Sequence, residues 1–185
     1  MTSVQVSVVV ACTRPERIEA LARALAVDGD VTCELLVAGS VDGLDAAGWP
    51  VPTTLVPCDD RHPNVRRSRA LDHAVGDVVA FVDDDAVPQP GWLSAAAELD
   101  PSSSELWTGP EVPVRTSPGA LLAHAVGLSP LAEGTRAHVA QGDGSLAWFE
   151  VPFCNLVVSR RFLASLAPLP VDVPWDVDDF VVCRG

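Results

Sequence analysis

The chain alternates runs of β-branched apolar residues with segments of helical periodicity, and this alternation limits its fold more than any other feature. Four apolar runs are predicted as strands: VQVSVVVAC (4–12), CELLVAG (33–39), TTLVPC (53–58) and DVVAFV (77–82). The longer runs are nearly continuous, which is typical of strands covered on both faces. Because helical segments alternate with strands, the sequence predicts βαβ units and an α/β fold with a Rossmann-like, mostly parallel central sheet flanked by helices.

The second half of the chain is less regular than the first. Pieces of strand are predicted in ELWTGPEVPVR (105–115) and LAWFEVPFCNLVVS (146–159), which indicates a smaller mixed sheet. We find no internal repeat and no interdomain linker, and 185 residues suit one domain. We therefore expect a single domain over residues 1–185.

Polar residues are placed where helices are predicted to begin. Thr13 and Glu16 have the spacing of a capping box. Asn64 is placed to cap a helix over 64–75, and Ser159 to cap the segment RRFLASLA.

The composition argues against several classes of protein. The net charge is −13 and the isoelectric point about 4.4, so nucleic acid is a poor partner. Lysine is absent from the 12 basic residues, which excludes a Schiff-base or P-loop lysine. The five cysteines lack the spacing of a metal knuckle or redox pair. No apolar run is long enough to be a transmembrane segment and the N-terminus lacks a signal-peptide pattern, so we expect a cytoplasmic protein.

Three adjacent carboxylates, Asp83, Asp84 and Asp85, follow the 77–82 strand directly; we call them the acidic triplet. In open α/β sheets, ligands bind at the carboxyl ends of the strands. Carboxylate oxygens are ligands that Mg²⁺ and Mn²⁺ prefer, and a cation would offset their mutual repulsion. Taken alone, the triplet is better explained as a helix N-cap with spare acids in a solvated turn.

Four blocks of the sequence, in order, resemble family 2 glycosyltransferases of the GT-A fold. They are VSVVVACTRPERIEALARAL, NVRRSRALDHAVGDVVAFVDDDAVPQPGWL, FEVPFCNLVVSRRFLASL and DVPWDVDDFVVCRG. The resemblance implies a GT-A (nucleotide-diphospho-sugar transferase) fold, with a nucleotide-sugar donor half over 1–100 and an acceptor half over 101–185. It further implies a metal-dependent, inverting hexosyltransferase that uses Mn²⁺ or Mg²⁺ and a hydroxyl acceptor such as a glycan, a lipid-linked sugar or a natural product.

By this resemblance the acidic triplet is the DxD motif of the family. Asp85 and Asp83 are then the metal ligands, and Asp83 and Asp84 also face the donor. The resemblance adds further donor-binding candidates from the first strand, the second strand and the 64–75 helix: Thr13, Arg14, Glu16, Asp42 and Arg69. Asp42 is included because Gly39 and Ser40 stand where the family has an acid that contacts the base.

The 64–75 helix carries three arginines near its start. Arg66 and Arg69 are three residues apart and share a face, whereas Arg67 points elsewhere. The shared face is interpreted either as a diphosphate site or as a solvated face paired with nearby aspartates. The resemblance favours Arg69 as the functional arginine.

The resemblance places the catalytic base close to the C-terminus. Asp178 and Asp179 are the candidates, with Asp179 preferred and Asp176 nearby. Asn155 and Trp175 are assigned to the acceptor side. Only six residues follow Asp179, so we expect a short acceptor half. This half is left open, is completed by a partner protein or a homodimer, or belongs to a trimmed or degenerate form of the domain.

Two other functions remain as alternatives. A noncatalytic domain that binds a nucleotide sugar would tolerate the short ending and the missing acid of the second strand. A sugar nucleotidyltransferase is less consistent with the sequence, because it usually has a glycine-rich basic loop and a lysine near the first strand.

Overall fold

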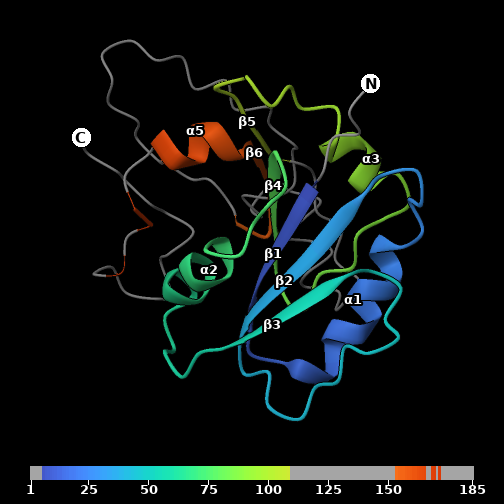
Figure 1. Cartoon of the computed structure of the whole chain (residues 1–185), viewed down its shortest axis with the longest axis vertical. Coiled ribbons are helices and arrows are strands. Elements are labelled where there is room, and N and C mark those ends of the chain that lie inside the picture. The colour runs from blue at the N-terminus through green and yellow to red at the C-terminus, as the bar shows by residue number, and fades with distance from the viewer. Residues whose placement is uncertain (1–5, 109–152, 166–167, 170, 172–185) are drawn as a thin grey trace, which may run out of the picture.

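The computed structural model describes residues 6–108, 153–165, 168–169 and 171 (Figure 1). Its core is a six-stranded sheet in the order β3-β2-β1-β4-β6-β5. The strands are β1 (Val6–Cys12), β2 (Cys33–Gly39), β3 (Thr53–Pro57), β4 (Val78–Val82), β5 (Leu106–Thr108) and β6 (Asn155–Ser159). The first four are parallel to one another, and β6 runs antiparallel to β4 and β5. The strands from the second half thus extend the central sheet as its antiparallel part.

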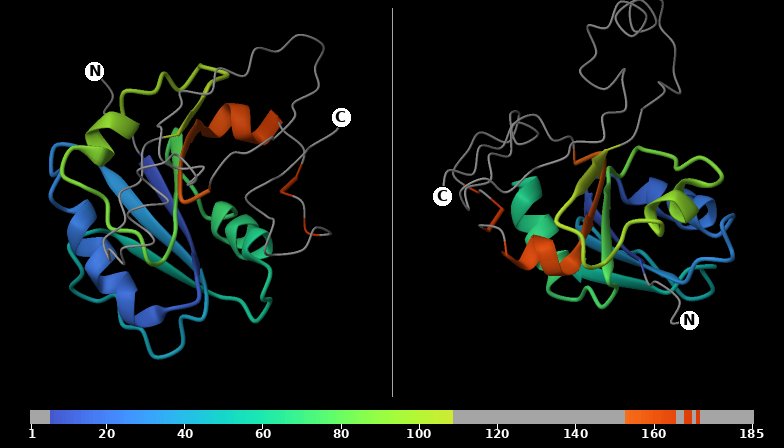
Figure 2. Two further views of the ribbon diagram at one scale, coloured as in Figure 1. Left: turned by 180° about the vertical axis from the view of Figure 1, so that it is seen from behind. Right: turned by 90° about the horizontal axis from the view of Figure 1, so that it is seen from above.

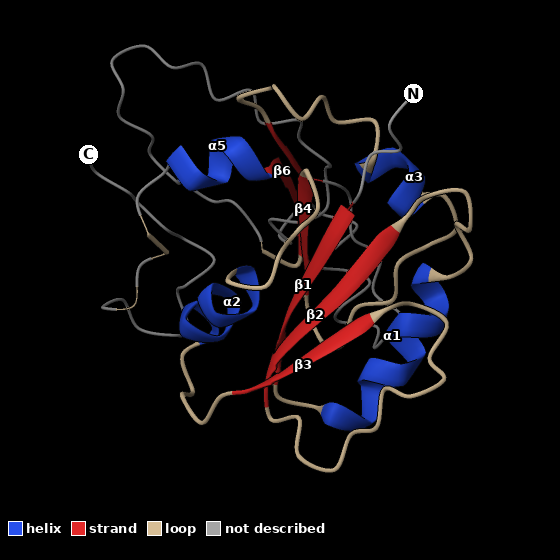
Figure 3. Cartoon of the chain, in the orientation of Figure 1, coloured by secondary structure: helices blue, strands red, loops and turns tan. Residues whose placement is uncertain are grey.

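Helices cover both faces of this sheet, giving three layers (Figures 2 and 3). On one side lie the 3₁₀ helix η1 (Pro15–Arg17), α1 (Ile18–Leu25) and α3 (Trp92–Ala96). On the other side lie α2 (Pro63–Leu71) and α5 (Arg160–Ser165). None of the helices within the described ranges combines the length and apolar character that crossing a membrane requires.

The two faces of the sheet have separate hydrophobic cores, which explains the continuous apolar strands. In β1, Val8 and Val10 pack in the core with Leu21 of α1, whereas Val9 packs in the core with Ala70 of α2. Successive side chains of a strand point to opposite faces, so both sets must be apolar when both faces are covered. The predicted α/β fold with a mostly parallel sheet is confirmed.

The capping of α5 agrees with the sequence-based prediction, whereas the start and the length of α2 differ from it. Ser159 caps α5 as predicted, because its hydroxyl accepts a hydrogen bond from the Phe162 amide (3.1 Å). The helix predicted over 64–75 is shorter, and His62 takes the capping position that was assigned to Asn64. The His62 Nδ1 accepts from the Asn64 amide at 3.2 Å, while Asn64 itself is buried.

Candidate functional site

The acidic triplet lies at the carboxyl edge of the sheet, directly after β4. Because β1 pairs in parallel with both β2 and β4, the turns that follow these three strands meet at this edge. The register places Cys12, the last residue of β1, opposite Gly39, the last residue of β2. The order of the strands therefore brings together residues from the turn after β1, from α2 and from the triplet.

Asp84 is the buried member of the triplet and is only 5% exposed. Its Oδ2 accepts hydrogen bonds from the Thr13 amide (2.5 Å), the Thr13 hydroxyl (2.7 Å) and the Arg14 amide (2.8 Å). A buried carboxylate needs such donors because burial removes its hydration. Since the donors belong to the turn after β1, Asp84 fastens that turn to the end of β4, and its oxygens are largely occupied.

These bonds replace the capping box that the sequence predicted. The residue at the start of η1 is Arg14, and no side chain forms a capping hydrogen bond there. Thr13 donates its hydroxyl to Asp84 instead, and Glu16 is exposed in η1. The capping-box prediction was wrong because a partner 71 residues away binds the threonine.

Asp85 is the open member of the triplet, and its side chain is 44% exposed. Arg14 Nη1 contacts Asp85 Oδ2 and lies 3.3 Å from Asp84 Oδ1, so one guanidinium bridges two acids. The Asp85 charge, followed by the hydrogen bond to it and by the Asp84 charge, raises the pKa of Arg14 above its ordinary value. The arginine thus contacts the carboxylate that the family resemblance assigns to a metal.

Asp83 is held by Arg67, the arginine that was predicted to point elsewhere. Arg67 is 5% exposed, and its Nη2 lies 3.4 Å from Asp83 Oδ1. Its Nη1 donates to Asn64 Oδ1 (3.0 Å), and its guanidinium carbon lies 4.3 Å from the centroid of the Phe153 ring. A cation over an aromatic face is stabilised by the negative potential of the ring. Arg67 is therefore a fixed positive charge at the edge of the triplet.

The helical spacing of the sequence contained a signal for this arrangement. Arg67 precedes Ala70 by three residues and Leu71 by four, so it belongs to the stripe of α2 that packs on the sheet. An arginine on an apolar stripe requires partners in the interior, and for Arg67 these are Phe153, Asn64 and Asp83.

The Cys12 carbonyl and Arg66 together explain why the second strand ends in glycine. Arg66 is 5% exposed and donates from Nε to the Asp60 carbonyl (2.6 Å) and from Nη1 to the Cys12 carbonyl (2.5 Å). Gly39 has φ of +133°, and a Cβ there would lie 2.3 Å from the Cys12 oxygen and 2.9 Å from Arg66 Cδ. No acidic side chain fits at that point. Asp42, its suggested substitute, is exposed in the turn after β2, and no hydrogen bond or ion pair within the described residues joins it to the triplet.

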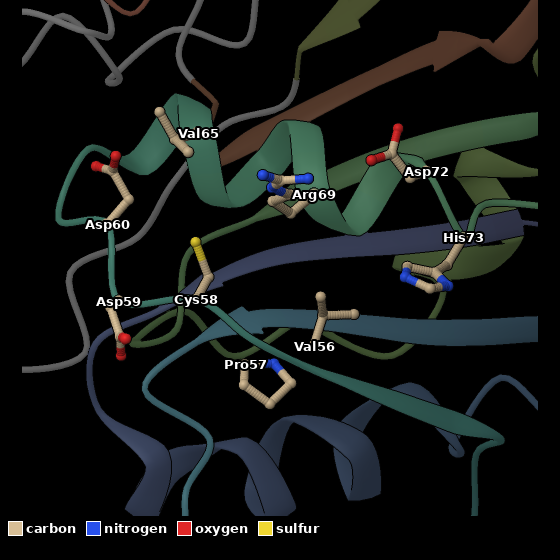
Figure 4. A pocket seen from close by; sticks show the side chains of 9 residues that line it. All are labelled: Val56, Pro57, Cys58, Asp59, Asp60, Val65, Arg69, Asp72 and His73. Carbon is tan, nitrogen blue, oxygen red and sulfur yellow. The ribbon is translucent and has the colours of Figure 1, made fainter.

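Arg69, the arginine favoured from the sequence, lies away from the triplet. It is exposed and forms no ion pair with any acid of the described residues. It lines a pocket of about 470 Å³ between α2 and the edge strand β3, the α2–β3 pocket (Figure 4). The pocket is lined by Val56, Pro57, Cys58, Asp59, Asp60, Val65, Arg69, Asp72 and His73.

Asn155 lies beside the triplet, at the start of β6. Its register partner is Val82, the residue that immediately precedes Asp83. The Asn155 Oδ1 accepts a hydrogen bond from Trp92 Nε1 at 2.8 Å. The structure therefore brings this predicted acceptor-side residue close to the predicted donor site.

Asp28 holds the segment that follows the triplet, which the sequence did not reveal. Its Oδ1 accepts from the Gly91 amide (2.7 Å) and its Oδ2 from the Leu93 amide (2.8 Å). These amides begin α3, so Asp28 caps that helix from the turn after α1. The segment between the triplet and α3 is thus fastened at one end by Asp84 and at the other by Asp28.

The predicted catalytic base lies outside the described residues, as do Asp176 and Trp175. Asp178 and Asp179 belong to the same range, so their assignment stays a prediction.

The chemistry of the acidic triplet fits a divalent cation through its outer members. Asp83 and Asp85 offer hard oxygen ligands and their side chains are 42% and 44% exposed, whereas the oxygens of Asp84 are taken up by the turn after β1. Within the described ranges, no group of three or more histidine, cysteine or acidic side chains converges on one point. A cation held here would accordingly take further oxygen ligands from water or from a bound anion.

Solved structures with the same architecture are GT-A glycosyltransferases. The mannosyltransferase PcManGT from Pyrobaculum calidifontis, in complex with GDP-Man and Mn²⁺, matches 96% of this chain at 19% identity with a TM-score of 0.61. Glucosyl-3-phosphoglycerate synthase from Mycobacterium tuberculosis, in complex with UDP, matches 96% at 20% identity with a TM-score of 0.52. The chain has the GT-A fold.

The matches cover most of this chain but a smaller share of each solved structure. The chain spans 51% of the mannosyltransferase chain and 63% of the synthase chain. S. aureus TarS 1-349 matches 89% of this chain at 19% identity, with 45% of its own chain covered and a TM-score of 0.51. No protein-family model and no curated protein matches the sequence.

Proposed function

We propose that the protein is a cation-dependent, family 2-like glycosyltransferase that moves a hexose from a nucleotide-diphosphate sugar to an acceptor hydroxyl. The observation that carries this proposal is the acidic triplet at the carboxyl edge of a GT-A sheet, where two acids are exposed and the middle one is tied to the turn after β1. Ligands of open α/β sheets bind at this edge. Neighbours of the same fold are complexes with GDP-Man and Mn²⁺ or with UDP-Glc and Mn²⁺, which supports a similar donor here.

In this proposal the described residues divide the work of binding the donor. Asp83 and Asp85 hold the cation, Mn²⁺ or Mg²⁺, with Asp83 also near the ribose. Asp84 keeps the turn after β1 in place, so that Thr13 and Arg14 face the nucleoside diphosphate. Arg67 adds a buried positive charge beside Asp83. The cation, when bound, supplies positive charge to the diphosphate.

The reaction breaks the bond between the anomeric carbon and the diphosphate oxygen. The departing nucleoside diphosphate gains negative charge, and positive groups positioned at this edge stabilise that charge most strongly in the transition state. The acceptor oxygen forms the new bond from the opposite face, with inversion, as its proton passes to a carboxylate. By resemblance to the family, we assign the role of this proton-accepting carboxylate to Asp179 or Asp178.

Binding of the donor tests this proposal most directly. Thermal unfolding is followed with UDP-, GDP- and dTDP-sugars, each with and without Mn²⁺. We expect one of the nucleotides to raise the Tm only when Mn²⁺ is present, because ligand binding to the native state stabilises it. The proposal is contradicted if no nucleotide gives Mn²⁺-dependent stabilisation.

The noncatalytic alternative makes a different prediction about turnover. Slow donor hydrolysis that is lost in Asp85→Ala but kept in Asp179→Asn would separate donor activation from deprotonation of the acceptor. Donor binding without hydrolysis or transfer to any acceptor would favour a noncatalytic nucleotide-sugar-binding domain.

A further inference from the structure

The Arg14 side chain is paired with Asp85, the carboxylate that the proposed function assigns to a cation. Its Nη1 contacts Asp85 Oδ2 and lies 3.3 Å from Asp84 Oδ1. Two positive groups cannot share the same carboxylate oxygen without mutual repulsion. A cation that takes Asp85 Oδ2 must therefore displace Arg14 or force it to a new position.

The Arg14 side chain is much less constrained by its surroundings than the Arg67 side chain. The backbone amide of Arg14 is fixed by Asp84 Oδ2 (2.8 Å), but its side chain is 46% exposed. The side chain of Arg67 is 6% exposed and is held between Asn64 and the Phe153 ring. Exposed ion pairs are weak and exchange readily, whereas a buried arginine with several partners does not.

The balance of charge shows what the displaced arginine requires. The triplet contributes three carboxylates, and Arg14 and Arg67 contribute two guanidinium groups. A cation alone would bring further positive charge beside an arginine that has lost one of its two carboxylate partners. A diphosphate that arrives with the cation offers new oxygens, and arginine binds phosphate through charge-assisted hydrogen bonds.

We propose that Arg14 couples the binding of the cation to that of the nucleoside diphosphate, by holding Asp85 in the free site and exchanging it for a phosphate oxygen when both ligands bind. This inference rests on the proposed function. It makes Arg14 a competitor of the cation when nucleotide is absent and a ligand of the phosphate when nucleotide is present. Removal of the guanidinium therefore has opposite effects under the two conditions.

The test measures Mn²⁺ affinity by titration calorimetry, with and without saturating GDP or UDP. The variant is Arg14→Gln, which keeps the backbone amide that bonds to Asp84 and removes the charge. We expect tighter Mn²⁺ binding than in the unaltered protein when nucleotide is absent, and weaker binding when it is present. The coupling between the ligands should fall by about tenfold or more, within the usual range of such couplings.

Arg17→Gln is the matched control for the loss of one positive charge. Arg17 is exposed in the same 3₁₀ helix and forms no ion pair within the described residues. It should change Mn²⁺ affinity in the same direction under both conditions and leave the coupling intact. Thermal unfolding of both variants checks that the fold is retained.

The outcomes separate this inference from the proposed function. If the unaltered protein binds no nucleotide with Mn²⁺, the proposed function fails. If it does, but Arg14→Gln keeps the same coupling or shifts both affinities in one direction, only the role of Arg14 is overturned.

Discussion

The two edges of the parallel sheet satisfy their carboxylates in different ways. At the amino edge, Glu34 Oε1 accepts hydrogen bonds from the Ser7 hydroxyl (2.6 Å) and the Val75 amide (2.8 Å). The Ser7 hydroxyl in turn accepts from the Gly76 amide (2.8 Å). This network joins β1 and β2 to the turn before β4, and its donors are neutral.

At the carboxyl edge, the middle acid of the triplet is bonded in a similar manner, to backbone amides and a hydroxyl. Asp84 accepts from the turn after β1, but Asp83 and Asp85 remain more than 40% exposed and face the guanidinium groups of Arg67 and Arg14. A single acid whose oxygens accept hydrogen bonds from neutral donors links elements of the fold and needs no further ligand. A group of acids that is partly exposed and faces arginines is suited to a charged ligand.

The largest effect is expected from a methyl group at the end of β2. In Gly39→Ala, the new Cβ would lie 2.3 Å from the Cys12 oxygen and the φ of +133° would be strained. We expect a loss of about 3 kcal/mol in the free energy of unfolding, or failure to fold. Gly43→Ala is the control, because it has φ of +77° with no atom within 4 Å of the added Cβ, and should lose about 1 kcal/mol. Equal losses in urea unfolding would contradict the close approach of the Cys12 carbonyl and Arg66 to Gly39.

A smaller loss, with an effect on binding, is expected when the buried arginine is replaced. Arg67→Met removes the donor to Asn64 and Asp83, so we expect a loss of about 1–3 kcal/mol in unfolding free energy. Nucleotide affinity in the presence of Mn²⁺ should fall as well, because a positive charge is lost beside the triplet. Arg69→Met, on the exposed side of the same helix, should change stability by less than about 0.5 kcal/mol. If Arg69→Met weakened nucleotide binding more than Arg67→Met, the donor site would have to include the α2–β3 pocket.

The amino edge should affect stability alone. Ser7→Ala deprives the Gly76 amide and the Glu34 carboxylate of a hydroxyl that is fully buried, so we expect a loss of about 1–3 kcal/mol in unfolding free energy. Mn²⁺ and nucleotide affinities, measured by calorimetry, should be unchanged. Ser94→Ala removes an exposed hydroxyl and serves as the control. A change in ligand affinity on Ser7→Ala would break the functional distinction between the two edges.

The smallest effect concerns two buried thiols, one at each edge. Burial, followed by the charge of Asp84, raises the pKa of Cys12 to about 11, and burial, followed by the charge of Asp28, raises the pKa of Cys33 to about 11. Because the folded pKa values exceed the ordinary value of 9.0, this contribution to stability is complete below about pH 9 and is lost as the pH rises toward 11.

The pH dependence of the alkylation rate of each thiol can show which neighbouring carboxylate raises its pKa. Asp28→Asn should lower the pKa of Cys33 and leave that of Cys12 in place, since Asp28 raises only the former. Equal shifts at both thiols would show that their environments are not separate.

The sequence predicted the sheet well because its signals are local. The run 33–39 coincides with β2, and the run 77–82 contains β4. Ser159 was recognised as a cap because its partner, Phe162, is three residues away. The capping box at Thr13 failed for the opposite reason, since the hydroxyl binds a residue far along the chain.

By itself, then, the sequence determined a parallel α/β sheet covered on both faces and the position of three acids at its carboxyl edge, because apolar periodicity and strand ends are written in neighbouring residues. The tertiary structure alone decided how those acids differ. Asp83, Asp84 and Asp85 are chemically identical, and the folded surroundings bury one of them beside Thr13 and leave two of them partly exposed beside Arg67 and Arg14. The same holds for the arginines of α2, whose roles depend on the carbonyls, carboxylates and aromatic ring that folding brings beside them.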